Sequence, residues 1–201
     1  EKIDPVRYIS NKSSGKMGFS LAKAAVDESA IVTLISGPVT LDTPERVKRI
    51  DIESAVEMKE HVTANLSDID LFISTAAVAD FKMKNAQPQK IKKDQSKNMS
   101  LSLEKNEDIL KHVSDNNPDL KIVGFAAETE NMIDNARKKL SSKNLNLIVA
   151  NDVSDSSIGF DSNYNEVTLI TEKEEFKIPK TSKEKVARKI VHFISKNILN
   201  D

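Results

Sequence analysis

The sequence predicts an α/β protein with a three-layer, Rossmann-like architecture around a mostly parallel sheet. Two observations indicate this fold. Short apolar runs, rich in Ile, Val and Leu, alternate along the chain with longer amphipathic stretches, and strands that alternate with helices form βαβ units. The apolar runs are also nearly continuous, as strands must be when helices cover both faces of a parallel sheet. The 201 residues have the length of one domain, 1–201.

The first half of the chain contains two predicted helices and two predicted strands. Gly15–Ser29 and Ser54–Leu66 carry apolar residues at every third or fourth position, which is the helical period. Ile31–Ile35 and Leu71–Ser74 are short apolar runs typical of buried strands. The Lys-rich segment Phe81–Ser100 shows no period, and long irregular segments within a compact domain are usually functional loops or disordered ones.

The second half of the chain adds two buried strands with a helix between them, and then a different ending. These first elements are Ile122–Phe125, Asn131–Leu140 and Leu145–Ala150. Glu166–Ile170 and Glu175–Ile178 predict an antiparallel hairpin at the edge of the sheet. Ser182–Leu199 predicts a closing helix with an apolar stripe. An antiparallel edge is common on an otherwise parallel sheet.

The composition excludes several classes of protein. Without cysteine the chain cannot form disulfides, use a thiolate nucleophile or ligate zinc or iron–sulfur clusters through sulfur. A formal net charge of -1 argues against a nucleic-acid partner. No apolar run has the roughly 18–20 residues that cross a bilayer, so we expect a cytoplasmic protein without a membrane partner. His61, His112 and His192 lie on separate predicted helices, so no metal site made of side chains is expected.

The polar segment Asp4–Gly18 leads into the first predicted helix. Ser13, Ser14 and the free N–H groups of that helix could hold a phosphate or a carboxylate. Alternatively, a serine simply caps the helix. Gly18 favours a functional interpretation slightly, because a glycine inside a helix costs about 1 kcal/mol unless another group must approach closely.

Three further segments have both a functional and a structural interpretation. Ser74–Asp80 lies at the carboxyl end of a predicted strand, which is where ligands bind in open α/β sheets. Asp80 could bind a ribose hydroxyl or a metal-held phosphate, or it could form a turn. The lysines of Lys90–Lys93 could close over phosphates, or face solvent. Lys139 and Lys143, four residues apart on one predicted helix face, could meet the same polyanion or form a solvated face.

Together these segments resemble one family, the bacterial phosphopantothenate–cysteine ligases of coenzyme A biosynthesis. The motifs that carry the resemblance occur in the family's order and are Asp4–Gly18, Ala76–Asp80, Lys90–Lys93, Gly124–Thr129 and Ala150–Val153. The resemblance implies one ligase domain over 1–201. The family's domain opens with a strand and a Gly-rich turn, so we expect those elements ahead of Glu1. A flavin-dependent decarboxylase precedes the ligase in many bacteria; no part of it is present here, so no flavin is expected.

The resemblance also implies a reaction in two steps. The carboxylate of 4′-phosphopantothenate attacks CTP to give an acyl-cytidylate and pyrophosphate, and the amine of L-cysteine then displaces CMP. Mg²⁺ or another divalent cation would be held by the triphosphate rather than by side chains. Family members are dimers, so a homodimer is expected. The choice of CTP over ATP rests on the resemblance alone.

By the same resemblance, Asn11 acts at the acyl centre and Lys90 acts on the phosphates, and both are expected to be catalytic. Arg7 and Ser14 join Asn11 in binding the substrate, and Arg7 could instead order its loop. The nucleotide site also includes Ala76, Ala77, Asp80, Asp108, Ile109, Leu110, Phe125, Lys139 and Lys143.

Two other functions stay open. An NAD(P)-dependent oxidoreductase on the same type of sheet would need a Gly-x-Gly-x-x-Gly turn after a strand, and the visible chain has none. A non-catalytic nucleotide-sensing module would bind CTP without turnover.

Overall fold

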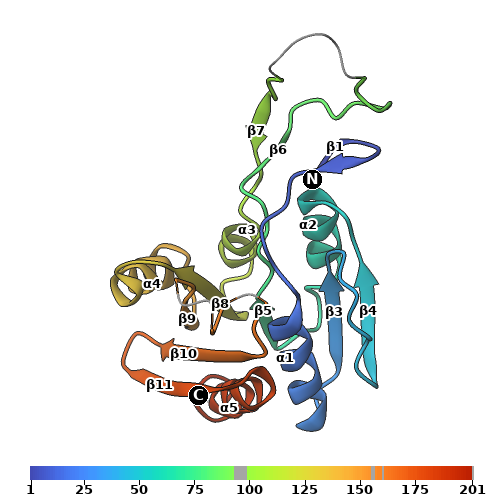
Figure 1. The fold of residues 1–201 in the computed structure, drawn as a ribbon. Helices are drawn as coiled ribbons and strands as arrows, with labels where there is room; N and C mark the ends of the chain where they lie inside the picture. Colours follow the sequence, from blue (N-terminus) through green and yellow to red (C-terminus); the bar gives the residue numbers. More distant parts are fainter. Residues whose placement is uncertain (93–98, 155–156, 160, 201) are drawn as a thin grey trace.

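The computed structural model describes residues 1–92, 99–154, 157–159 and 161–200, and it confirms the α/β class (Figure 1). Helices and strands alternate through most of the chain, as predicted. The elements are, in order, β1 (Lys2–Asp4), β2 (Arg7–Tyr8), α1 (Lys16–Asp27), β3 (Val32–Ser36), β4 (Val47–Asp51), α2 (Ala55–Ala64), β5 (Leu71–Ser74), β6 (Phe81–Met83), β7 (Leu103–Lys105), α3 (Ile109–Asn116), β8 (Lys121–Glu128), α4 (Met132–Ser142), β9 (Leu147–Asp152), β10 (Tyr164–Ile170), β11 (Glu175–Ser182) and α5 (Lys183–Asn197).

The central sheet has five strands in the order β11-β10-β9-β8-β5. The strands β5, β8 and β9 are parallel to one another, whereas β10 pairs antiparallel with both β9 and β11. The predicted antiparallel hairpin and closing helix are therefore confirmed. The sheet as a whole is mixed, and its parallel part brings the carboxyl ends of β5, β8 and β9 to one edge.

The predicted strand after α1 does not join this sheet. β3 pairs in parallel with β4, and within the described residues this pair forms a separate two-stranded sheet. β4 was not predicted, because its charged residues interrupt any apolar run: its sequence is VKRID. Among the described strands, β3 and β5 each have one hydrogen-bonded neighbour, so each has one edge without a partner there. The strand expected ahead of Glu1 stays a prediction.

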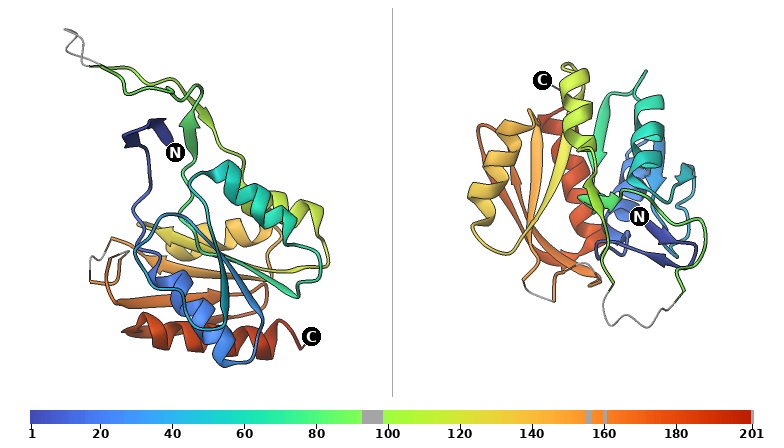
Figure 2. Two further views of the ribbon diagram at one scale, coloured as in Figure 1. Left: turned by 90° about the vertical axis from the view of Figure 1, so that its right-hand side faces the viewer. Right: turned by 90° about the horizontal axis from the view of Figure 1, so that it is seen from above.

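Helices cover both faces of the central sheet, which makes the three layers (Figure 2). Successive residues of a strand point to opposite faces, so Ile122 packs under α2, α3 and α4 while Val123 packs against α1 and α5. Ile148 and Val149 divide between the same two cores. Because both faces are buried, the strands are apolar at nearly every position.

A narrow arm projects from the domain (Figures 1 and 2). It consists of the β6–β7 hairpin and the described residues between these strands, with the β1–β2 hairpin beside it. The prediction of an irregular segment over Phe81–Ser100 is therefore wrong at its start, since Phe81 pairs with Lys105 in an antiparallel ladder. The three-residue strands are too short to show a period in the sequence.

The burial of α5 generates a stability prediction. The side chain of Ile190 is fully buried against the sheet, whereas the neighbouring Lys189 is exposed. We expect Ile190→Ala to lower the free energy of unfolding by about 2–5 kcal/mol, because it removes buried methyl groups and leaves a cavity. The matched Lys189→Ala should change it by less than about 0.5 kcal/mol. Urea denaturation measures both, and equal losses would contradict this packing.

Candidate active site

The candidate site lies at the edge where the parallel strands end. The segment between β2 and α1 lies against the segment that follows β5, because Asn11 Nδ2 donates to the carbonyl of Val78 at 3.0 Å. At the start of α1, Lys16 Nζ donates to the carbonyl of Asp161, beyond the end of β9, at 2.8 Å. Chain segments distant in sequence therefore meet at this edge, where ligands bind in open α/β sheets.

Asn106 joins two of the predicted nucleotide-binding segments. It is buried, its backbone N–H donates to the carbonyl of Asp80 at 2.8 Å, and its side-chain amide donates to the carbonyl of Ala79 at 2.8 Å. These bonds hold the segment Ala76–Asp80 beside the start of α3. A buried amide is stable only when its donors are satisfied, so Asn106 fixes the relative position of the two segments.

The start of α3 places Asp108, Ile109 and Leu110 next to β8. Asp108 is the N-cap of α3: its carboxylate accepts a hydrogen bond from the N–H of Lys111 at 3.0 Å and is paired with Lys143 Nζ at 2.7 Å. Burial by itself would raise the pKa of Asp108, but the bonds from Lys143 and Lys111 and the charge of Lys143 outweigh it, so the pKa is lowered. The carboxylate therefore stays ionised.

Close packing joins α3 to β8 beside the half-buried Phe125. Gly124, the residue before Phe125, has no room for a side chain, since a Cβ there would lie 3.1 Å from Leu110 and 2.8 Å from Leu145. This contact brings Leu110 of α3 against the strand that carries Phe125. The predicted nucleotide residues of α3 and β8 are therefore brought together.

The two predicted phosphate-binding lysines of α4 each have a carboxylate partner. Lys139 Nζ lies 2.5 Å from Glu128 Oε1, at the end of β8, and Lys143 is paired with Asp108. Both lysines thus have ionic partners while their side chains stay partly exposed, and their binding of phosphate stays a prediction. Lys143 also lies at the C-cap of α4, beyond the last helical residue. Ionic partners, which the helical period does not report, hold both side chains.

The start of α1 is not capped by a serine side chain. Its N-cap is Gly15, in the left-handed region at φ 73°, and no side chain caps the helix. The interpretation as a simple serine cap is therefore wrong, and Ser14 lies directly before this turn. Gly18 has a packing role, since a Cβ there would come within 2.9 Å of Thr75 Oγ1, just after β5. That close approach brings α1 to the end of the strand.

Arg7 contacts the arm at Ile91, the residue that follows Lys90. Arg7 forms an ion pair with the buried Asp4 at 2.7 Å and also donates to the carbonyl of Ile91 at 3.3 Å. Lys90 is exposed, and its ammonium makes no hydrogen bond or ion pair with the residues that the structure describes. The last residue of the lysine motif, Lys93, lies outside the described residues. Arg7 thus orders its loop, one of the two roles expected for it.

Three residues of this site, Asp4, Asn106 and Glu128, lie within motifs of the sequence, but the sequence predicted no role for any of them. Each acts by holding another segment or side chain. Such a role depends on contacts between residues far apart in the chain, and no spacing in the sequence reports it. Glu128, for example, holds Lys139 across 11 positions.

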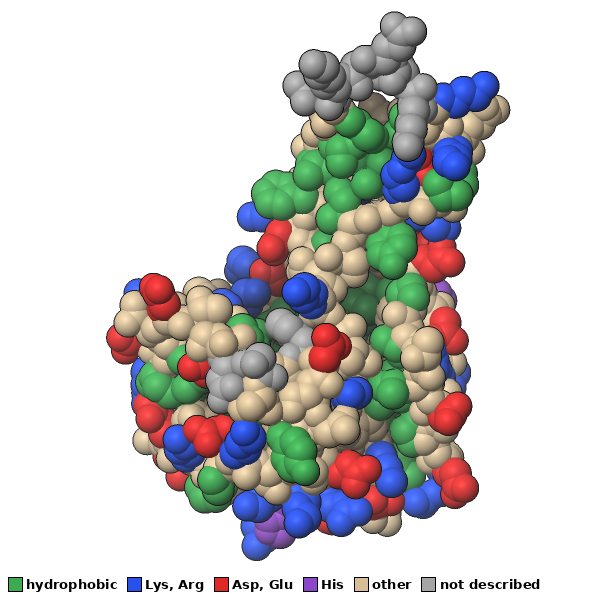
Figure 3. All heavy atoms as spheres, viewed as in Figure 1, with side chains coloured by type: hydrophobic (Ala, Val, Ile, Leu, Met, Phe, Trp, Pro, Cys, Tyr) green, Lys and Arg blue, Asp and Glu red, His purple; other side chains and the backbone are tan. Residues whose placement is uncertain are grey.

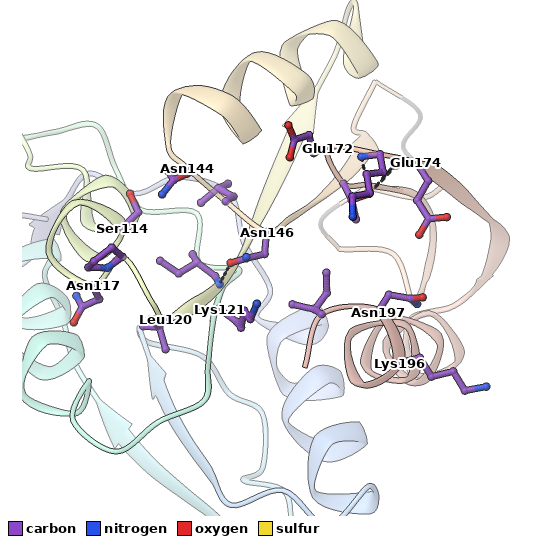
Figure 4. A pocket seen from close by; sticks show the side chains of 16 residues that line it. Ser114, Asn117, Leu120, Lys121, Asn144, Asn146, Glu172, Glu174, Lys196 and Asn197 are labelled. Atoms are coloured by element: carbon purple, nitrogen blue, oxygen red, sulfur yellow. Dashed lines mark hydrogen bonds between the residues drawn. The ribbon is translucent and has the colours of Figure 1, made fainter. Parts of the chain in front are cut away.

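A depression of about 460 Å³ lies at the opposite edge of the sheet (Figure 4). Asn144, Asn146, Lys121 and Glu174 line it together with residues from the end of α5, and none of the predicted site residues does. It lies at the amino ends of β8 and β9. Ligands in open α/β sheets bind outside the carboxyl ends, so the candidate site is the other edge.

The described residues contain no group of three or more His, Cys, Asp or Glu side chains placed to hold a metal ion. His61, His112 and His192 lie on α2, α3 and α5, and His112 Nδ1 faces Glu107 at 3.2 Å. No helix in the described ranges has the length and apolar character to cross a membrane.

Residues 1–198 match the family model of the DNA/pantothenate metabolism flavoprotein C-terminal domain. The chain belongs to this family. It is 46% identical over 198 residues to the coenzyme A biosynthesis bifunctional protein CoaBC of Vibrio cholerae, covering 96% of this chain and 49% of that protein. The chain thus spans about half the length of the curated relatives it matches.

Solved structures extend the likeness to three dimensions. The crystal structure of the C-terminal domain of CoaBC superposes with a TM-score of 0.84 at 39% identity, covering 100% of this chain and 91% of that chain. A Cab2 mutant in complex with phosphopantothenate-cysteine superposes with a TM-score of 0.75 at 15% identity, covering 95% of this chain and 81% of that one. The second likeness shows the fold alone. The resemblance seen in the motifs is thus confirmed at the level of the family.

The lowered pKa of Asp108 generates a prediction on acid stability. A carboxyl group whose pKa is lower in the folded chain stabilises the fold above its ordinary pKa, and this contribution is lost as the pH falls through the lowered value. We expect the stability contributed by Asp108 to be constant between about pH 7 and 5 and to fall below about pH 4. Urea denaturation across this pH range should show that the free energy of unfolding falls less steeply with decreasing pH in Asp108→Asn than in the wild type. Identical slopes would contradict the role of the Asp108–Lys143 pair.

Proposed function

We propose that this chain joins 4′-phosphopantothenate to L-cysteine, using CTP and passing through an acyl-cytidylate. One observation carries the proposal. The hydrogen bonds of Asn11 and Asn106 bring the predicted acyl-binding segment and both nucleotide-binding segments to one edge of the sheet. Membership of a pantothenate-metabolism family supports the substrate class.

In the first step, a carboxylate oxygen of 4′-phosphopantothenate attacks the α-phosphorus of CTP, and pyrophosphate leaves. Negative charge builds on the phosphate oxygens, so fixed cations lower the barrier. Lys90 is exposed and has no ionic partner among the described residues, so its ammonium is accessible for this role. The ammonium groups of Lys139 and Lys143 would leave their carboxylate partners and bind the triphosphate instead. The residues that surround the nucleoside in this proposal are Ala76, Ala77, Asp80 and Phe125. In this proposal Ser14 joins Asn11 in holding the acyl substrate. No protein nucleophile is needed.

In the second step, the cysteine amine attacks the acyl carbon, the bond to the CMP oxygen breaks, and the amine loses a proton. Negative charge develops on the acyl oxygen. The amide of Asn11 has two N–H donors. One donates to the carbonyl of Val78, which orients the amide, and in this proposal the second serves the acyl oxygen. Positioning and charge stabilisation supply the catalysis.

A divalent cation fits this site only together with the nucleotide. Mg²⁺ takes oxygen ligands and usually binds through one or two carboxylates plus substrate phosphates. Asp80, exposed at the strand edge, is the carboxylate that the nucleotide segment offers. We propose that the cation enters on the triphosphate and neutralises its charge.

We also propose that the chain forms a homodimer through the arm. Phe81, Met83 and Leu103 lie on one face of the β6–β7 hairpin, whereas Lys82 and Glu104 pair on the other face at 3.5 Å. Phe81 is 51% exposed and Leu103 is 43% exposed, and the apolar side chains gather on the upper arm in Figure 3. A second copy would cover this face.

Substitution of Asn11 tests the two-step chemistry. With CTP, 4′-phosphopantothenate and cysteine supplied, we expect Asn11→Ala to keep releasing pyrophosphate while the acyl-cytidylate accumulates. Cysteine capture should slow about 10²–10³-fold, because a donor to the developing oxyanion is lost. Quenched-flow chromatography measures both steps. If both half-reactions fell together, Asn11 would have a binding or folding role instead.

The wild-type controls of that experiment separate the competing functions. Omitting each substrate in turn should abolish pyrophosphate release when CTP or 4′-phosphopantothenate is absent. CTP binding without any pyrophosphate release would favour a nucleotide sensor, whereas NADH binding with no CTP dependence would favour an oxidoreductase. Replacing CTP by ATP in the same assay shows which of the two nucleotides supports pyrophosphate release.

The dimer proposal has its own test. Sedimentation equilibrium should give twice the mass of one chain for the wild type and a monomer for the double variant Phe81→Ser, Leu103→Ser. Leu199→Ser removes an apolar side chain of similar exposure, outside the arm, and should leave the dimer intact. A monomeric wild type, or a dimer that survives both changes in the arm, would overturn the proposal.

A further inference from the structure

Asp4 is a buried carboxylate of the β1–β2 hairpin, which lies beside the arm. The residue is 2% exposed, and it ends β1 just before the turn that leads to Arg7. An ionised carboxylate is expensive to bury unless several donors surround it. The hydrogen-bond donors around Asp4 therefore show which chain segments its carboxylate holds in place.

Four hydrogen bonds converge on this carboxylate. Oδ1 accepts from the N–H groups of Val6 and Arg7, both at 2.9 Å. Oδ2 accepts from Arg7 Nη1 at 2.7 Å and from the N–H of Ile91 at 3.2 Å. The first pair shapes the β1–β2 turn. The last bond spans 87 positions of the chain and anchors the irregular segment of the arm that follows β6.

Two other contacts reinforce this anchor. Arg7 Nη1 donates to the carbonyl of Ile91 at 3.3 Å, so both backbone polar groups of Ile91 are held by the Asp4–Arg7 pair. Further along, the N–H of Gln87 donates to the carbonyl of Ile3 at 2.9 Å. Lys90 lies between these two anchored positions, although its own ammonium is unpaired within the described ranges. Its backbone is fixed while its side chain stays available.

We propose that Asp4 is a positioning residue, which acts with Arg7 to hold the backbone of Lys90 where its ammonium meets the phosphates. The inference rests on the proposed function for the role of Lys90. It gives Asp4 no contact with the substrate. A cation on an arm that is otherwise exposed can stabilise a transition state only when its position is set in advance, and the Asp4 carboxylate sets it.

The electrostatics agree with this role. Burial would raise the pKa of Asp4, but the hydrogen bonds from Val6, Ile91 and Arg7 and the charge of Arg7 outweigh it, so the pKa is lowered. The anchor therefore stays charged at neutral pH. Among the described residues, Arg7 is the charged group that faces this carboxylate, and the arm contributes the backbone N–H of Ile91.

The first test measures the anchor without any activity. Trypsin cleaves after Lys90, and the cleaved bond joins Lys90 to Ile91. We expect Asp4→Asn and Arg7→Gln to raise the cleavage rate about tenfold or more, since loss of a charge-assisted hydrogen bond changes an opening equilibrium by about that factor. Mass spectrometry identifies the site. Cleavage after Lys84, whose backbone is bonded to Ser102, is the internal control and should stay unchanged.

The matched control variant is Asp51→Asn. It removes a carboxylate that is paired with Arg49 at 2.6 Å on β4, away from the arm, and it should leave cleavage after Lys90 unchanged. Circular dichroism shows whether each variant is folded, and Arg7→Gln carries the test if Asp4→Asn is not. Unchanged cleavage after Lys90 in the folded variants would overturn the proposal.

The second test separates positioning from general stability. Asp4→Asn should slow pyrophosphate release about 10²-fold, because a misplaced catalytic group loses about that factor. Lys90→Gln should slow it about 10²–10³-fold, and the double variant should be no slower than Lys90→Gln alone. Multiplied losses would show that Asp4 acts independently of Lys90, which overturns the proposal.

The two tests also distinguish this inference from the proposed function. If the wild type released no pyrophosphate, the ligase proposal would fail, and the protease result would still decide whether Asp4 anchors Lys90. If the wild type were active and the rate losses of Asp4→Asn and Lys90→Gln multiplied in the double variant, the ligase proposal would stand and the positioning role of Asp4 would be overturned.

Discussion

The burial of the central sheet between two helical layers is the constraint on which the remaining structure depends. Val123 and Val149 face α1 and α5, while Ile122 and Ile148 face α2, α3 and α4. With both faces covered, β5, β8 and β9 are free to present polar groups only at their ends. The carboxyl ends of these parallel strands lie at one edge, and the hydrogen bonds of the following segments are made there. The candidate site follows from the packing of the sheet.

Carboxylates organise the cations of this site. Asp108 holds Lys143, Glu128 holds Lys139, and Asp4 holds Arg7. The pairs of Lys139 and Lys143 are partly exposed, and ion pairs of that type add little to stability, so their main effect is on position. A lysine that already has an anionic partner can exchange it for a phosphate with a small change in net solvation. Lys90 differs, since it is held through its backbone and keeps its ammonium free among the described residues.

Much of the fold could be predicted because its signals are local. The helical period of Ser54–Leu66 and the apolar runs at Leu71–Ser74 and Leu145–Ala150 depend on residues near one another in the chain. The elements that the sequence missed have weak local signals: three of the five residues of β4 are charged, and β6 and β7 have three residues each. Their formation depends on partners that the chain supplies elsewhere.

The sequence by itself determined the class of the fold, the antiparallel ending, and the family, since the motif Asp4–Gly18 needs no contact to be recognised. Only the tertiary structure decided which side chains act on one another. It separated the β3–β4 pair from the main sheet, gave Lys139 and Lys143 their carboxylate partners, and joined Asp4 to Ile91 across 87 positions. The physical reason is that backbone preference and apolar period are properties of neighbouring residues, whereas hydrogen bonds and ion pairs form between groups that folding alone brings together.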